Sequence, residues 1–322
     1  MKKIAVFTSG GDSPGMNACI RAVVRTAVFN KIEVSGIMYG YSGMIENDFI
    51  ELNTQSVANI IQRGGTILKT SRCEEFKTIE GRKKAFENLR KNKIEGLVCI
   101  GGDGTYTGAS IFYKEFGIPS VGIPGTIDND LFGTDHTIGY DTALNTAMDA
   151  IDKIRDTADS HNRVFLVEVM GRSTGFIALA VGIAGGAESI IIPEDNDDET
   201  RLFESFRSSS RRQKSFSIIV VAEGERGGAA NIASKLKSEF PYLDIRTTVL
   251  GHIQRGGNPS ARDRILATRL GVSAVERLIE GGKNECAGLI NNKVCFTSFN
   301  DAVQNKKPLP KYIYSLTEIL SR

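Results

Sequence analysis

Two aspartates separated by one residue stand out in the stretch GIPGTIDND, residues 122–130. Asp128 and Asp130 follow an apolar, β-branched run that is typical of a buried strand. On an extended backbone, residues i and i+2 point the same way, so both carboxylates can face one ligand if that backbone persists. A carboxylate can accept the proton of a hydroxyl that receives a phosphoryl group. The alternative is a solvated turn, since Asp and Asn after glycine are good turn formers.

Paired glycines followed by an aspartate occur twice, in AVFTSGGDSPG (5–15) and LVCIGGDGTYTG (97–108). Glycines let backbone amides approach phosphate oxygens, and the start of the helix that follows favours an anion. Asp103 could hold a magnesium ion that bridges such phosphates. A single copy is about as easily a plain turn, but two copies that each open a helix favour a phosphate site. Neither copy is a Walker A sequence or a complete G-x-G-x-x-G, which argues against a P-loop kinase.

The elements that must position these loops are short apolar runs that read as strands, at residues 4–7, 96–100, 119–123, 163–169, 189–192 and 216–221. Helix-period segments lie between them. In the segment NACIRAVVRTAVF one apolar stripe comprises Ile20, Val23, Val24, Ala27 and Val28. This alternation predicts an α/β fold with two doubly wound α/β/α domains and mostly parallel sheets, whose ligands bind at the carboxyl ends of the strands.

Composition narrows the possible partners. The 322 residues carry 40 basic and 38 acidic side chains, so the net charge of +2 supplies no broad positive field for nucleic acid. The five cysteines lie far apart without a CxxC pair, which indicates neither a disulfide framework nor a zinc site. No stretch has the length of a membrane span, and the first apolar run is too short for a signal peptide. We therefore expect a soluble, cytoplasmic protein.

Six motifs together resemble the bacterial ATP-dependent 6-phosphofructokinase family: SGGDSPGMNACIRAVVR, IGGDGTYTGA, PGTIDND, VEVMGR, AEG and VLGHIQRGG. They stand in the family's order and spacing over essentially the whole chain. The resemblance implies phosphorylation of D-fructose 6-phosphate at its 1-hydroxyl to give fructose 1,6-bisphosphate and ADP, the committed step of glycolysis. ATP would be the co-substrate and Mg²⁺ the cofactor. We assign residues 1–138 with 251–301 to a larger ATP-binding domain and 139–250 with 302–322 to a smaller sugar-phosphate and effector domain.

By this resemblance Asp128 is the base and Thr126 lies beside it, while Arg72 and Arg172 neutralise the transferring phosphoryl group. The ATP phosphates would contact Gly11, Arg72, Cys73, Gly102, Asp103, Gly104 and Thr105, with Asp103 as the magnesium ligand. The sugar phosphate would contact Thr126, Ile127, Asp128, Asp130, Arg163, Met170, Gly171, Arg172, Glu223, Arg246, His252 and Arg255. Without the motifs, the arginines would read as exposed surface residues and His252 as a packed one.

Arg163 and Arg246 match arginines that reach the 6-phosphate from a neighbouring subunit, which implies a homotetramer with shared active sites. Guanidinium groups suit this role because they bind phosphate through two parallel hydrogen bonds. Pyrophosphate-using members of the family carry Asp at the position of Gly104 and Lys at that of Gly125. A carboxylate there would crowd and repel an ATP phosphate, so both glycines favour ATP as the donor.

The family's regulatory site between subunits is matched in part. Its phosphate and magnesium contacts correspond to Arg21, Arg25, Arg155, Glu188, Arg212 and Lys214. Thr54, Gln55 and Asn59 stand where well-regulated members carry Arg, Tyr and Asp. The loss of an arginine removes a charge-assisted phosphate contact, so we predict weak activation by ADP and weak inhibition by phosphoenolpyruvate.

Several other functions share part of this pattern, and the motifs separate them to different degrees. Lipid and NAD kinases share GGDGT after a strand, but PGTIDND and GHIQRGG belong to phosphofructokinases. A pyrophosphate-dependent phosphofructokinase is one alternative function, and a sensor that binds nucleotide and sugar phosphate without turnover is another. A dinucleotide-dependent oxidoreductase lacks its complete glycine fingerprint and the acidic residue that follows it.

Overall fold

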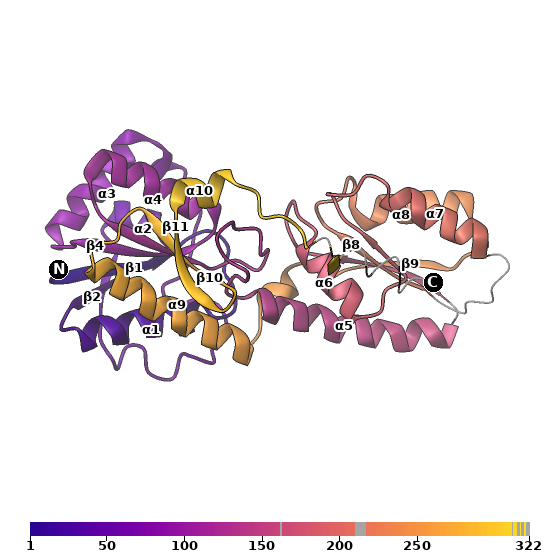
Figure 1. Cartoon of the computed structure of the whole chain (residues 1–322), viewed down its shortest axis with the longest axis horizontal. Helices are drawn as coiled ribbons and strands as arrows, with labels where there is room; N and C mark the ends of the chain where they lie inside the picture. Colours follow the sequence, from indigo (N-terminus) through magenta and orange to yellow (C-terminus); the bar gives the residue numbers. More distant parts are fainter. Residues whose placement is uncertain (162, 210–216, 311, 314–315, 317–318, 320–322) are drawn as a thin grey trace. The chain divides into compact units, whose positions relative to one another are not determined.

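Two α/β units make up the chain in the computed structural model, which describes residues 1–161, 163–209, 217–310, 312–313, 316 and 319 (Figure 1). Unit 1 comprises Met1–Ile127, Leu131–Thr142 and Arg255–Lys307. Unit 2 comprises Asp128–Asp130, Ala143–Gln254 and Pro308–Arg322. We predicted that the chain passes between domains after residues 138, 250 and 301. In the structure it passes between the two units after residues 142, 254 and 307. The ligand assigned to each domain stays a prediction.

Unit 1 is built on a seven-stranded sheet in the order β11-β10-β5-β4-β1-β2-β3. The strands are β1 Lys3–Thr8, β2 Glu33–Ile37, β3 Phe49–Leu52, β4 Gly96–Gly101, β5 Ser120–Pro124, β10 Glu285–Ile290 and β11 Lys293–Ser298. All neighbours pair in parallel except the two edge pairs, β2 with β3 and β10 with β11. The sheet therefore has a parallel centre closed by one antiparallel strand at each edge.

Helices cover both faces of this sheet. On one face lie α1 (Met16–Phe29) and α9 (Ala261–Ile279), and on the other lie α3 (Ile79–Lys91), α4 (Asp103–Phe116) and α10 (Phe299–Gln304) (Figure 1). The short helices are α2 Tyr41–Glu46, η1 Glu75–Lys77 and η2 Gly251–Arg255. Separate apolar clusters fill the two interfaces. Each strand of the parallel centre is buried on both sides, which explains its continuous apolar run.

The apolar stripe predicted for α1 is right except at one position. Ile20, Val23, Val24 and Ala27 are buried, whereas Val28 is exposed. At 100° per residue, Val28 lies about 80° around the helix from Ile20, at the edge of the stripe.

Unit 2 has an all-parallel four-stranded sheet in the order β7-β8-β6-β9. Its strands are β6 Val164–Val169, β7 Ser189–Ile191, β8 Ser217–Ala222 and β9 Ile245–Val249. Its helices are α6 Phe176–Ala184, α7 Asp198–Ser209 and α8 Gly228–Glu239, and α5 Tyr140–His161 enters it from unit 1. An apolar cluster joins α7 and α8 to the sheet, with Leu166, Phe203 and Ile232 among its members. The predicted fold class, parallel sheets covered by helices in two domains, is confirmed.

Among the described residues, no helix combines the length and the apolar character needed to cross a lipid bilayer.

Candidate functional site

Three loops meet at the carboxyl edge of the sheet in unit 1. In the register of β1, β4 and β5, Thr8 pairs with Ile100 and Gly101 pairs with Pro124, so these strands end at the same level. The amide of Ser9 donates to Ile100 O (3.0 Å), and the amide of Gly125 donates to Gly101 O (3.0 Å). Both GGD loops and the PGTIDND loop therefore begin side by side, as expected for strands of a parallel sheet.

The segment 70–73 completes the first GGD loop. Thr70 Oγ1 donates to Gly10 O at 2.8 Å, and the Thr105 hydroxyl donates to Ser9 O at 3.2 Å. Arg72 is exposed, while Cys73 packs against the apolar cluster of the α3–α4 face. The first GGD loop thus contacts both segment 70–73 and the start of the second GGD loop. These three segments carry the residues predicted to contact ATP phosphates: Gly11, Arg72, Cys73, Gly102, Asp103, Gly104 and Thr105.

The second GGD loop forms the start of α4. Gly102 provides no side-chain cap to the helix, and Asp103 Oδ1 accepts the amide of Gly104 at 2.8 Å. The Tyr41 hydroxyl donates to Thr105 O at 2.6 Å and fixes the first turn from the other side. Amides at a helix start, beside paired glycines, can bind phosphate oxygens.

Asp103 has the chemistry of a magnesium ligand. Within the described ranges, no group of three or more His, Cys, Asp or Glu side chains could hold a metal ion. Magnesium commonly uses only one or two carboxylates together with substrate phosphates and water. A single carboxylate beside a candidate phosphate-binding loop fits that pattern. Asp103 is therefore suited to bind a magnesium ion that is also coordinated by the phosphates of a bound substrate.

The two glycines that bear on donor choice differ in their surroundings. A Cβ atom at Gly104 would meet nothing within 4 Å, which leaves space beside the helix start. A Cβ atom at Gly125 would lie 2.9 Å from Ile100 Cγ2 and 3.1 Å from Met16 Cε. Gly104 is therefore open toward a ligand, whereas Gly125 is fixed by the packing of the core.

The expectation that Asp128 and Asp130 point the same way depended on an extended backbone, and the structure does not show one there. Instead, β5 ends at Pro124 and Asn129 has φ +56°. A left-handed residue between the two aspartates removes the strand alternation on which the argument depended. Thr126 is half-buried and is fixed by Thr137, whose hydroxyl donates to Thr126 O at 2.6 Å. Ile127 and Asp128 are buried.

A second set of predicted residues lies at the carboxyl edge of the sheet in unit 2. Glu223, directly after β8, accepts the amides of Gly171 (3.3 Å) and Arg172 (2.7 Å), which follow β6. Arg172 has φ +56°, an unfavourable conformation for a side chain with Cβ, and the carboxylate holds its amide in place. The Arg172 side chain is exposed and so is His252, which contradicts a packed histidine.

Gln254 is a residue of this edge that the sequence prediction missed. It is buried, and its Oε1 accepts the amide of Met170 at 2.8 Å. The signal was present within GHIQRGG, where only the histidine and arginine had been assigned roles. Side chains of Glu223 and Gln254 thus hold the backbone of residues 170–172 in place.

Three predicted sugar-phosphate arginines lie elsewhere. Arg163 and Arg246 both bind Asp244, at 2.7 Å and 2.9 Å, near the amino ends of β6 and β9. The Arg163 hydrogen bond lowers the pKa of Asp244 below its usual value. Within one chain these two arginines are therefore not brought to the edge that carries Arg172. Arg255 belongs to unit 1, where its Nη1 donates to Asp12 O at 3.2 Å and lies beside Gly11.

The predicted effector residues are distributed over both units. Arg21 and Arg25 lie on α1, and Thr54 and Asn59 are exposed in the loop after β3. Arg155 donates to Gly185 O and Gly186 O, and Glu188 accepts the amide of Ile218. Arg212 and Lys214 fall outside the described residues. Arg155 and Glu188 therefore have structural partners of their own within unit 2.

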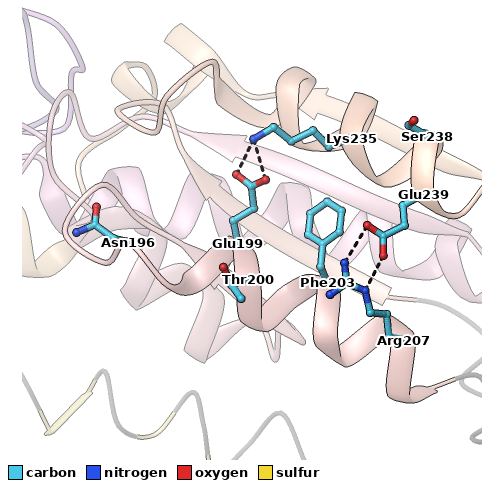
Figure 2. Close-up of a pocket in the computed structure, with 8 residues that line it drawn as sticks. All are labelled: Asn196, Glu199, Thr200, Phe203, Arg207, Lys235, Ser238 and Glu239. Atoms are coloured by element: carbon cyan, nitrogen blue, oxygen red, sulfur yellow. Dashed lines mark hydrogen bonds and ion pairs between the residues drawn. The ribbon is translucent and has the colours of Figure 1, made fainter.

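A pocket between α7 and α8 contains none of the predicted residues (Figure 2). Two ion pairs cross it, Lys235 with Glu199 and Arg207 with Glu239, on either side of Phe203. Each of these cations already binds a carboxylate of the pocket. We therefore interpret the two ion pairs as structural links between α7 and α8.

Comparison with known proteins gives a consistent result. The family model for phosphofructokinase matches residues 3–278. Proteins named ATP-dependent 6-phosphofructokinase in Cytophaga hutchinsonii and Bacillus pumilus are 56% and 54% identical over 322 and 321 residues. The alignments cover 100% of this chain and 98% and 100% of those proteins.

Solved structures match as well. Phosphofructokinase from Saccharomyces cerevisiae has a TM-score of 0.88 at 36% identity, covering 99% of this chain and 47% of the yeast chain. A pyrophosphate-dependent phosphofructokinase from Marinobacter aquaeolei has a TM-score of 0.84 at 23% identity, covering 97% of this chain and 86% of that chain. At that identity the second likeness shows the fold alone.

The packing around the two glycines predicts opposite effects on stability. Gly125→Ala should lower the free energy of unfolding by about 1–3 kcal/mol, because its Cβ overpacks Ile100 and Met16. Gly104→Ala, in open space within the first turn of α4, should leave stability unchanged or raise it by up to about 1 kcal/mol. Urea denaturation measures both, and equal stability of the two variants would contradict the packing described.

Proposed function

The chain belongs to the phosphofructokinase family, and we propose that it transfers the γ-phosphoryl group of ATP to the 1-hydroxyl of D-fructose 6-phosphate. The products are fructose 1,6-bisphosphate and ADP, and the reaction is the committed step of glycolysis. The observation that carries the proposal is full-length identity above one half with proteins named for this activity. The family and the enzyme class predicted from the sequence are confirmed.

The donor end of the reaction uses unit 1. Backbone amides at Gly11 and at Gly102–Thr105 bind the ATP phosphates, and Arg72 adds a positive charge. When bound, Mg²⁺ neutralises phosphate charge, and Asp103 holds it. The open space at Gly104 favours ATP over pyrophosphate as the donor, since no side chain approaches the phosphates there.

The acceptor end uses Asp128 as the base that takes the proton of the sugar hydroxyl. Its burial supports this role, because a base shielded from water can hold the substrate hydroxyl in one position. Thr126 and Asp130 bind beside it, and Arg172 offers its charge to the moving phosphoryl group. The bond from the Arg172 amide to Glu223 supports that placement, since it fixes the backbone from which the guanidinium extends.

The 6-phosphate of the sugar binds Arg163 and Arg246 of a neighbouring subunit in a cytoplasmic homotetramer. Their position in the chain supports this proposal: both lie near the amino ends of their strands, whereas Arg172 and Glu223 lie at the carboxyl edge. Both cations already share Asp244, which orders them for a second, bidentate partner. Met170, His252 and Arg255 complete the proposed sugar set.

Replacement of the base should strongly reduce turnover while leaving substrate binding intact. Asp128→Ser should lower kcat by roughly 10² to 10⁴, because proton transfer to a positioned base contributes that much. Calorimetric titration with ATP and with fructose 6-phosphate checks that both still bind. Asp130→Asn is the matched control in the same loop, and its loss should be clearly smaller. A loss in Asp130→Asn equal to or greater than that in Asp128→Ser would contradict the assignment.

Activity should depend on magnesium, and Asp103 should determine how tightly the ion binds. Removal of the ion with EDTA should abolish activity, and Asp103→Asn should raise the Mg²⁺ concentration needed for half-maximal rate by about tenfold or more, because a neutral amide binds the hard ion more weakly. Initial rates across a magnesium series at fixed ATP measure this. An unchanged magnesium curve in the variant would remove Asp103 from the site.

Regulation should be weak. Thr54, Gln55 and Asn59 replace an arginine, a tyrosine and an aspartate of well-regulated relatives, so effector phosphates lose a charged partner. Addition of ADP or phosphoenolpyruvate should therefore change the half-saturating fructose 6-phosphate concentration less than about twofold. A many-fold change with either compound would overturn this expectation, and Thr54→Arg tests whether the response can be restored.

A further inference from the structure

Asp263 is a buried carboxylate to which the motifs assigned no role. It lies in the first turn of α9 and is 1% exposed. Its Oδ1 accepts the amide of Gly139 at 2.9 Å, and its Oδ2 accepts the amide of Thr142 at 2.8 Å and also the Thr142 hydroxyl. These amides belong to the start of α5, where helix N–H groups lack partners within the helix. One helix thus fixes the beginning of another.

The residues just before α5 are attached in turn to the acceptor loop. Thr137 Oγ1 donates to Thr126 O at 2.6 Å, and the Ile138 amide donates to Pro124 O at 2.8 Å. Gly125 and Ile138 also form a parallel bridge. A shift of Gly139 would therefore move residues 137–138 and, through them, the backbone that leads into Asp128.

Asp263 also lies close to the segment that follows the first GGD loop. A Cβ atom at Gly15 would lie 2.6 Å from Ile138 Cγ2 and 3.6 Å from Asp263 Cβ. A Cβ atom at Gly139 would lie 2.6 Å from Ser13 Cβ. Backbone from the donor side and backbone from the acceptor side thus pack against one another at Asp263.

A neighbouring serine holds Asp263 itself. Ser260, the N-cap of α9, accepts the Asp263 amide at 3.2 Å and donates to Asp141 Oδ2 at 2.6 Å. Its own amide donates to Thr142 Oγ1 at 3.0 Å. Burial raises the pKa of the Asp263 carboxyl, and the hydrogen bonds it accepts oppose that rise. A buried carboxylate is costly to keep, and an apolar replacement would leave several donors unsatisfied.

We propose that Asp263 is a positioning residue for phosphoryl transfer. Through Gly139 and residues 137–138 it fixes, within unit 1, the backbone of residues 124–126 that leads into Asp128. This inference rests on the proposed function, and Asp263 would act through Gly139 and Thr142 rather than by contact with a substrate. A displacement of about 1 Å in a reacting group can cost about a hundredfold in rate, so small movements of residues 124–128 matter.

The test compares substitutions that disturb this network with one that disturbs only stability. In Asp263→Asn either orientation of the amide sets an NH₂ group against a backbone N–H, of Gly139 or of Thr142. We expect kcat to fall by about ten- to a hundredfold, with the KM for ATP within about twofold of wild type. Leu278→Ala, in the core at the far end of α9, is the matched destabilised control and should retain kcat.

A second pair keeps the test open if Asp263→Asn does not fold. Thr142→Val removes the hydroxyl that binds Asp263 and Ser260, whereas Thr142→Ser keeps it. The valine variant should lose several-fold in kcat and the serine variant should recover it. Equal kcat in folded Val and Ser variants, or a loss in Asp263→Asn no greater than in Leu278→Ala, would overturn the proposal.

Hydrogen exchange separates this inference from the proposed function. Amides of residues 125–139 should exchange faster in Asp263→Asn than in Leu278→Ala, at matched distance from each melting temperature. That measurement does not depend on turnover. Absence of product from the wild-type protein would contradict the proposed kinase activity. Unchanged hydrogen exchange of residues 125–139 in Asp263→Asn would contradict the positioning role of Asp263.

Discussion

The common level at which β1, β4 and β5 end is the constraint on which the rest of unit 1 depends. Parallel pairing fixes Thr8, Ile100 and Pro124 at one edge, so the loops that follow must share that edge. Loop residues then bind one another through backbone and short side chains, as Thr105 does with Ser9. The two GGD loops and the start of the PGTIDND loop consequently leave the sheet at one edge, and the proposed phosphoryl transfer requires donor and acceptor groups to be positioned together.

Close packing of backbone holds this edge together. Gly125 has no room for a side chain, and Gly15 and Gly139 approach Ile138 and Ser13 too closely to carry one. Hydrogen bonds from residues distant in the chain, such as those of Asp263 and Thr137, then fix the direction in which each loop leaves its strand. Unit 2 repeats the arrangement with Glu223 and Gln254, whose side chains hold the backbone that presents Arg172.

The sequence predicted the central strands because they are buried on both faces and read as continuous apolar runs. It missed β2, β3, β9, β10 and β11. All five lie at or next to a sheet edge, and β9 (IRTTV), the edge strand of its sheet, buries only Ile245 and contains no apolar run. The GGD loops at the ends of β1 and β4 could be located because paired glycines followed by an aspartate are a local signal. The left-handed Asn129 and the bond from Asp263 to Gly139 could not, since one is a local backbone state and the other joins residues 124 positions apart.

The central claim is that the chain moves the γ-phosphoryl group of ATP to a sugar hydroxyl. The most direct measurement is phosphorus NMR of the protein with Mg-ATP and fructose 6-phosphate. The account predicts that ADP and a new sugar 1-phosphate resonance appear in equal amounts, with the 6-phosphate signal retained. Inorganic phosphate in place of the new ester, transfer from pyrophosphate but not from ATP, or an unchanged spectrum would contradict it.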